Sequence, residues 1–254
     1  MSIVSYSKFN IFKDNIQSLS TPLTKEQLIH PDTFFLKESE NQKIRVYYAP
    51  FEHLNKNAKV VIVGITPGFS QMQKTYETVR SFKGEEATEE EILQEVKNQS
   101  SFQGPMRKNL VRLLDKLNLH TKLGLDTTNQ LFDEHSHLVH TTSVLPYPVF
   151  YWSKGGWSNF SSQSDVIKNH FLYEEVINHL PKEINEMDNP LIIPLGKPAN
   201  KAVTYLADNG YIKNQSILKR FPHTSGANQR YMIPAFEENY EDMMKTIEEH
   251  FSSK

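Results

Sequence analysis

The sequence predicts an α/β fold, a three-layer α/β/α sandwich with helices on both faces of a short, mainly parallel central sheet. Three short apolar runs, at residues 60–63, 138–144 and 191–196, have the length of buried strands. Segments with helically spaced apolar residues lie between them. Strands that alternate with helices form parallel sheets covered on both faces, so these two observations together predict the fold.

The first half of the chain supplies the central strand and the helices around it. Residues 1–40 carry apolar residues without a clean period, which predicts helical or irregular packing on the core. Residues 45–49 alternate weakly and predict a strand beside the central one. After Ser70, apolar residues recur at helical spacing. Thr88 and Glu91 form a capping box at the start of another helix, and a polar loop at 101–107 precedes a leucine-rich helix.

The second half continues the alternation. The strand at 138–144 holds His140, which we expect to be a core histidine with satisfied hydrogen bonds. Residues 145–164 are rich in aromatics and glycine and keep neither period, which predicts a long loop or lid. A helix at 171–180, the strand at 191–196, a helix from Lys197 to about Gly210, a short strand at 216–221 and a final helix follow.

Length and composition set limits on the function. The 254 residues fit one domain, 1–254, with an N-terminal extension at about 1–40 and an aromatic, glycine-rich loop insertion at about 145–164. The chain has no cysteine, which excludes disulfides, cysteine nucleophiles and cysteine-bound zinc. A net charge of −2 means that DNA contacts must come from a local patch. Without a signal peptide or bilayer-spanning run, we expect a cytoplasmic monomer with no membrane partner.

One turn stands out chemically. The buried run at 60–63 stops at Gly64, and Pro67 and Gly68 follow at once before a helix. In open α/β sheets such a turn lies where ligands bind, and the helix start offers free N–H groups to an anion. A plain connection between strand and helix is the alternative.

Four segments in order resemble the uracil-DNA glycosylase superfamily over about residues 58–235. Gly64-Ile65-Thr66-Pro67-Gly68 resembles its first motif and His223-Thr224-Ser225-Gly226 its second. Between them, Phe102-Gln103-Gly104 resembles the family's Phe-x-Gly segment, and 195–199 its late strand–helix junction. The resemblance implies the same sandwich fold and a monofunctional, metal-free and cofactor-free enzyme that hydrolyses the bond between a flipped-out base and deoxyribose in DNA.

The resemblance also implies roles for single residues. Thr66 stands where relatives hold the attacking water, and His223 where they donate to the departing base; the alternatives are a hydroxyl bonded within its turn and an inert loop histidine. Phe102 would stack on the base. Ser143 stands where uracil-reading relatives have asparagine, so the base is expected to be a modified pyrimidine, such as hydroxymethylated or glucosylated cytosine in phage DNA. The other residues expected at the base are Gly64, Ile65, Pro67, Gly68 and Phe69.

Backbone donors, arginines and the aromatic loop are expected to contact DNA. These residues are Gly104, Arg107, Trp152, Lys154, Trp157, Ser225, Gly226, Asn228 and Arg230. Two alternatives within the fold stay open: a catalytically inactive DNA- or protein-binding member, and a conventional uracil or deaminated-base repair glycosylase. An unrelated nucleotide-binding protein is a third, although the turn at Gly64 lacks both common phosphate-loop patterns.

Overall fold

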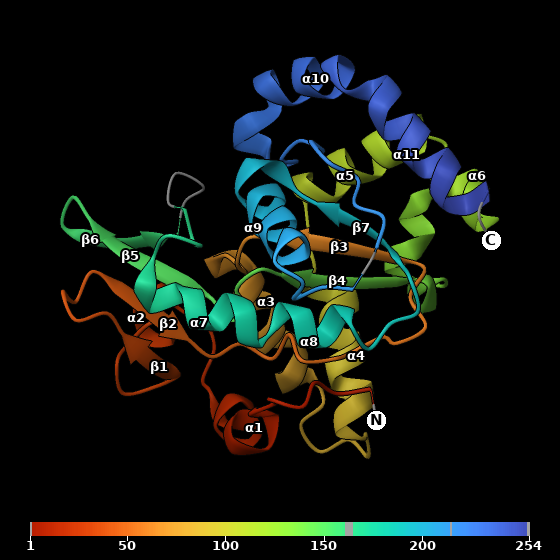
Figure 1. Ribbon diagram of the computed structural model, residues 1–254. Helices are drawn as coiled ribbons and strands as arrows, with labels where there is room; N and C mark the ends of the chain where they lie inside the picture. The colour runs from red at the N-terminus through yellow and green to blue at the C-terminus, as the bar shows by residue number, and fades with distance from the viewer. Residues whose placement is uncertain (1, 161–164, 214, 253–254) are drawn as a thin grey trace.

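The computed structural model describes residues 2–160, 165–213 and 215–252, and a three-stranded parallel sheet lies at its centre (Figure 1). Its strands are β3 (Val60–Gly64), β4 (Val139–Ser143) and β7 (Leu191–Pro194), in the order β4-β3-β7. Every residue of β3 is buried, as a central strand covered on both faces requires. The three strands predicted from apolar runs are thereby confirmed.

Side chains of β3 alternate between two helical layers. Val61 and Val63 face one core, and Val60 and Ile62 face the other. The first core is covered by α3 (Phe69–Ser81), α4 (Glu89–Ser100), α7 (His170–Asn178), α8 (Leu180–Ile184) and α9 (Gly196–Asp208). The second is covered by α5 (Pro105–Lys116), α6 (Leu119–Leu123), η1 (Thr128–Phe132), α10 (Gln229–Glu238) and α11 (Tyr240–Ser252). The predicted three-layer α/β/α sandwich is confirmed.

A second, antiparallel sheet was not predicted. It has the order β1-β2-β5-β6 and consists of β1 (Phe35–Glu38), β2 (Ile44–Tyr47), β5 (Val149–Ser153) and β6 (Gly156–Asn159). The strand expected at 45–49 is present as β2, but its predicted pairing with the central strand is wrong, because β2 pairs with β1 and β5. The first forty residues also supply α1 (Phe9–Ser18) and α2 (Lys25–Leu28), which bury Phe9 and Leu28 in the first core.

The loop expected at 145–164 contains a β-hairpin instead; residues 161–164 lie outside the described residues. Trp152 pairs with Trp157 across the hairpin. Lys154 and Gly155 occupy the turn with φ of +50° and +77°, the left-handed conformation that tight hairpins favour. Aromatic residues on both faces of β5 removed the alternation that would have identified a strand.

Most helix starts agree with the sequence. The capping box is confirmed at α4, where the Thr88 hydroxyl accepts from Glu91 N–H and the Glu91 carboxylate accepts from Thr88 N–H. The strand expected at 216–221 is wrong, because this segment makes one isolated bridge between Ile192 and Ile217. Among the described helices, none combines the length and the apolar character needed to cross a bilayer.

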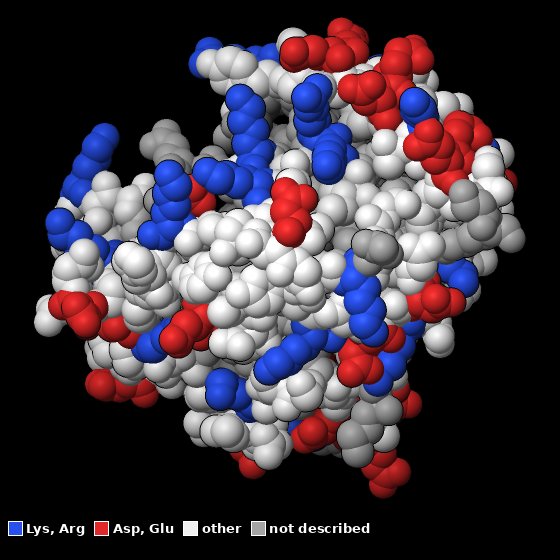
Figure 2. All heavy atoms as spheres, in the orientation of Figure 1, with Lys and Arg blue, Asp and Glu red and all other residues white. Residues whose placement is uncertain are grey.

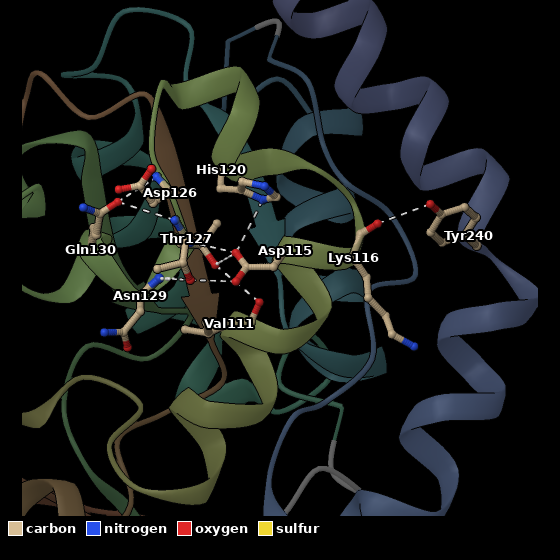
Figure 3. A network of polar contacts seen from close by, with 10 residues as sticks. Val111, Asp115, Lys116, His120, Asp126, Thr127, Asn129, Gln130 and Tyr240 are labelled. Carbon is tan, nitrogen blue, oxygen red and sulfur yellow. Dashed lines mark hydrogen bonds and ion pairs between the residues drawn. The ribbon is translucent and has the colours of Figure 1, made fainter.

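A polar cluster fixes the C-terminal end of α5 (Figure 3). The Asp115 carboxylate accepts hydrogen bonds from both threonine hydroxyls at 127 and 128 and from Thr128 N–H, each at 2.7 Å. Tyr240 on α11 donates to the Lys116 carbonyl at 3.2 Å. The cluster therefore fastens the C-terminal end of α5 to η1 and to α11.

Candidate active site

The predicted motifs meet at the carboxyl edge of the parallel sheet. Gly64 ends β3 opposite Ser143, which ends β4. On the other side, Leu195 N–H donates to the Val63 carbonyl, and Gly196 N–H donates to the Phe221 carbonyl, both at 2.9 Å. The turns that follow β3, β4 and β7 and the segment that precedes His223 therefore lie at one edge, where ligands bind in open α/β sheets.

Gly64, Phe102 and Ser143 form one cluster. A Cβ atom on Gly64 would lie 3.2 Å from Phe102 Cε1 and 3.3 Å from Ser143 Oγ. The cavity beside them, which Pro67 also lines, has a volume of about 20 Å³. A single water needs roughly 10–15 Å³, so this conformation admits a water but no base. Phe102 is buried with a left-handed φ of +52°, and a base would enter only after its ring moves.

Thr66 lies in the turn after β3 with its hydroxyl fully engaged as a donor. It donates to the Tyr147 carbonyl at 2.9 Å and accepts from Val149 N–H at 3.2 Å. The hydroxyl therefore ties the turn to the start of the hairpin rather than to its own backbone. One lone pair remains, which can accept a hydrogen bond from water but cannot remove a proton near pH 7.

Replacing Thr66 by valine should lower the free energy of unfolding by about 1–3 kcal/mol, because two backbone groups lose their partner. Thr66→Ser keeps the hydroxyl and should cost less than about 1 kcal/mol. Chemical denaturation of the two variants measures the difference. Equal stability of the valine and serine variants would show that the hydroxyl contributes nothing to the fold.

His223 lies against Gly196 and has a defined orientation. Its Nδ1 accepts from Ser225 N–H at 3.3 Å and lies 3.1 Å from the Ser225 hydroxyl. Because Nδ1 accepts a backbone hydrogen bond, the neutral ring carries its proton on Nε2. Burial lowers the pKa of His223 and keeps the ring neutral at pH 7. The ring is thus neutral, with its one N–H on Nε2.

The loop that carries His223 is anchored to α5. Asn109 Nδ2 donates to the carbonyl of the fully buried Thr224 at 3.0 Å. A Cβ on Gly226 would lie 3.7 Å from Pro105 Cβ, at the first residue of α5. Since Gly104 immediately precedes this helix, the second motif and the segment with Phe102 are neighbours in space. Ser225 and Gly226 therefore lie beside Gly104, and Asn228 ends the short helix η3 (Gly226–Asn228).

A groove of about 1030 Å³ opens from His223 between α9 and α10. Three basic residues, Lys197, Lys201 and Arg220, line it together with Tyr231 and with two acidic residues, Asp208 and Glu238. Figure 2 shows Lys and Arg side chains around the recess between the hairpin and α9–α10, whereas acidic side chains gather over the C-terminal part of α10 and over α11. Although the net charge is −2, this recess therefore has the local basic character that a DNA contact requires.

The hairpin forms the other wall of the recess. Trp152 is 46% exposed, and its ring meets Trp157 edge-on at 5.4 Å between centroids. The Arg45 guanidinium lies 4.4 Å from the centre of the Trp157 ring. Phe69 N–H, at the start of α3, donates to Asn159 Oδ1 at 2.9 Å, next to Gly68. The hairpin is therefore fastened to the first motif.

The two arginines predicted to contact DNA differ in placement. The Arg107 guanidinium donates to the Asn98 and Ser101 carbonyls at 2.8 and 2.7 Å and lies over Phe132, so it closes the C-terminal end of α4. These contacts direct the Arg107 guanidinium toward the end of α4, so Arg107 does not lie at the recess. Arg230 is exposed and lies over the Tyr231 ring, at the mouth of the groove.

The sequence model of the Uracil DNA glycosylase superfamily matches residues 51–248, which include all four motif segments. The chain belongs to this superfamily. A Bacillus subtilis (strain 168) relative, the uncharacterized protein YoxB, is 35% identical over 249 residues, with 96% of this chain and 94% of YoxB covered. The crystal structure of Pedobacter heparinus SMUG2 covers 95% of this chain and 96% of its own, at 13% identity and a TM-score of 0.42.

The sequence did not predict a buried polar network that contacts the first motif through Tyr147. Tyr147 donates to the Glu52 carboxylate at 2.7 Å, and His140 Nε2 lies 2.7 Å from the Glu183 carboxylate, which also accepts from Tyr6. Burial raises the pKa of Glu52. Burial also acts to raise the pKa of Glu183, but the contact with His140, the charge of Lys97 and the hydrogen bond from Tyr6 together lower it. The expectation of a satisfied core histidine at 140 is confirmed.

A buried lysine on α4 was also missed. Lys97 is only 7% exposed, although its helix begins with three glutamates that are typical of a solvated face. The signal was the helical period, since Lys97 follows Leu93 by four residues on the buried face. Among the described residues, no group of three or more His, Asp or Glu side chains is placed to hold a metal ion.

Proposed function

We propose that this protein is a monofunctional DNA glycosylase that hydrolyses the N-glycosidic bond of a flipped-out base without metal or cofactor. The observation that carries the proposal is His223, a half-buried neutral imidazole whose Nδ1 is engaged by Ser225, at the same sheet edge as Gly64, Phe102 and Ser143. Membership of the superfamily supports a DNA glycosylase.

The residues present fit a dissociative hydrolysis. The bond between C1′ and the base nitrogen breaks, and its electron pair leaves with the base. The Nε2–H of His223 donates to a base oxygen where negative charge develops, a role that preorganised donors fill in many enzymes. Water adds to C1′, its hydroxyl stays on the sugar and its second hydrogen ends on the released base. Thr66 contributes one acceptor for that water.

The proposed substrate is a modified pyrimidine, such as hydroxymethylated or glucosylated cytosine. Ser143 at the end of β4 offers a short hydroxyl that makes one hydrogen bond, where a larger amide would read both polar groups of uracil. The aromatic hairpin beside the first motif can stack on a base or sugar. Such a specificity would suit defence against phages with modified DNA.

The commitment of the Thr66 hydroxyl to Tyr147 favours a second candidate, a catalytically inactive DNA-binding member of the fold. One assay separates the candidates. Duplexes carrying uracil, hypoxanthine, 5-hydroxymethylcytosine or its glucosylated form are incubated with the protein and tested for alkali-labile sites. Sites at the modified cytosines support the proposal, sites at uracil alone identify a conventional repair enzyme, and binding without any sites identifies the inactive member.

The exposed hairpin should contribute to DNA affinity. Trp152→Ala should weaken binding of an abasic-analogue duplex about 5- to 150-fold, because stacking on one base is worth about 1–3 kcal/mol. Lys154→Ala should lower the salt slope of binding by about one. Fluorescence anisotropy at several salt concentrations measures both effects. Ile11→Ala on α1 and Lys245→Ala on the acidic α11 serve as controls, and equal losses in the controls would exclude a DNA contact at the hairpin.

A further inference from the structure

Lys97 is a buried cation beside the candidate base pocket. It projects from the inward face of α4, and its Nζ donates to the Thr141 carbonyl on β4. The Thr141 hydroxyl is in turn 2.7 Å from the Ser101 hydroxyl, next to Phe102. Because β4 is an edge strand of the parallel sheet, its outer carbonyls need partners from outside the sheet. That need accounts for one of the three N–H groups of Lys97.

Two cavities meet at this side chain. The small cavity that Phe102 and Ser143 line also borders Lys97 and Thr141. A second cavity, of about 340 Å³, borders the same two residues from the other side and is lined by polar side chains that include His53 and Asn98. The Lys97 side chain therefore borders both the candidate base pocket and a polar space.

The Lys97 ammonium group has three N–H donors, and its hydrogen bond to Thr141 uses one of them. Among the described residues, Thr141 is the hydrogen-bond acceptor found for Nζ, and no carboxylate lies within 4.0 Å of it. Burial lowers the pKa of Lys97 to about 8, and the charges of Glu183 and Glu52 oppose that drop. The neighbouring His140 and His53 both have lowered pKa values and are neutral at pH 7. Lys97 is thus largely protonated at pH 7, with two N–H groups left for a ligand or water.

We propose that Lys97 reads the flipped base by donating to an oxygen on its outer edge, and so selects pyrimidines that carry a C4 carbonyl or a C5 hydroxymethyl oxygen. This inference rests on the proposed glycosylase function. An ammonium group donates and cannot accept, so an oxygen acceptor satisfies it. The amino group of plain cytosine also donates, and a site built for an acceptor rejects it because buried donors would be left unpaired.

The test compares two sets of bases in which one member lacks the proposed acceptor oxygen. 5-Hydroxymethylcytosine and 5-methylcytosine differ by that oxygen alone and give the stricter comparison, whereas pyrimidin-2-one lacks the N3 proton of uracil as well as the C4 oxygen. Single-turnover excision is measured for uracil against pyrimidin-2-one and for 5-hydroxymethylcytosine against 5-methylcytosine, in the wild type, Lys97→Met and Lys97→Gln. The wild type should prefer the oxygen-bearing member of at least one pair about 10- to 100-fold, as expected for a hydrogen bond from a charged donor. Lys97→Met should reduce this preference to about threefold or less, and Lys97→Gln, which keeps a donor, should retain part of it.

The wild type provides a second test that needs no variant. The preference should shrink as pH rises through about 8, where Lys97 loses its proton because of its lowered pKa. A purely structural Lys97 predicts instead that Lys97→Met slows both members of a pair equally and that the preference is independent of pH; either result would overturn the inference. Absence of abasic product from every duplex with the wild type would overturn the proposed function itself, and this inference with it.

Discussion

His223→Ala should slow base excision about 100- to 1000-fold under single-turnover conditions while changing DNA affinity by threefold or less. The side chain presents a neutral Nε2–H donor, and removal of one preorganised donor to a developing oxyanion typically costs this much. The phosphate and stacking contacts proposed to determine affinity involve other residues, such as Trp152 and Lys154 of the hairpin. The rate is measured by quenched-flow or manual sampling with enzyme in excess over labelled duplex.

A matched variant separates the donor from a general effect of losing a histidine. His170→Ala removes an exposed imidazole at the start of α7, and its excision rate should equal that of the wild type. His223→Gln keeps a neutral N–H donor and should recover part of the lost rate. An unchanged rate in His223→Ala, with the protein folded, would remove His223 from the mechanism.

Gly196→Ala should reduce both stability and excision, because this glycine supports His223 from behind. Its φ of +81° is strained for any L side chain, at about 1–2 kcal/mol. In addition, a Cβ would lie 2.8 Å from His223 Cβ, closer than real Cβ contacts allow. The loop with His223 must shift, and a displacement of about 1 Å from productive geometry can cost about 100-fold in rate.

Gly210→Ala is the control for backbone strain. Gly210 has a similar φ of +74°, but no described atom lies within 4 Å of the point that its Cβ would occupy, so only the strain remains. Both alanine variants should lose stability in thermal unfolding, Gly196→Ala the more because the clash adds to the strain, and only Gly196→Ala should show a large loss of excision rate. Equal excision rates in the two variants would contradict a role for Gly196 in placing His223.

The parallel sheet was predictable because its signals are local. A run of β-branched residues that ends at Gly64 needs no long-range information to identify a buried strand. The second sheet was not predictable in the same way. β2 pairs with β5, about a hundred residues later, and the aromatic side chains of β5 hide its alternation. The hairpin turn at Lys154 and Gly155 was the available signal, and the aromatic composition around it favoured a loop.

The candidate site, too, was predictable from the sequence only in part. Topology places the turns after parallel strands at one edge, so the neighbourhood of the Gly64 turn and the His223 loop followed from the motifs. The state of each side chain depends on contacts far away in sequence. Thr66 is bound by a carbonyl 81 residues later, and Lys97 by one 44 residues later. The commitment of that hydroxyl is not visible in the local pattern, and the burial of that amine shows there only as the place of Lys97 in the helical period of α4.

Mass spectrometry of the reaction products tests the central proposal most directly. Duplexes carrying glucosylated or hydroxymethylated cytosine are treated with excess protein, and the small molecules and the DNA are weighed separately. The proposed hydrolysis predicts free base and abasic DNA in equal amounts, an unbroken strand until alkali is added, and strong dependence on His223. Unchanged DNA mass with every modified base, or strand cleavage without alkali, would contradict it.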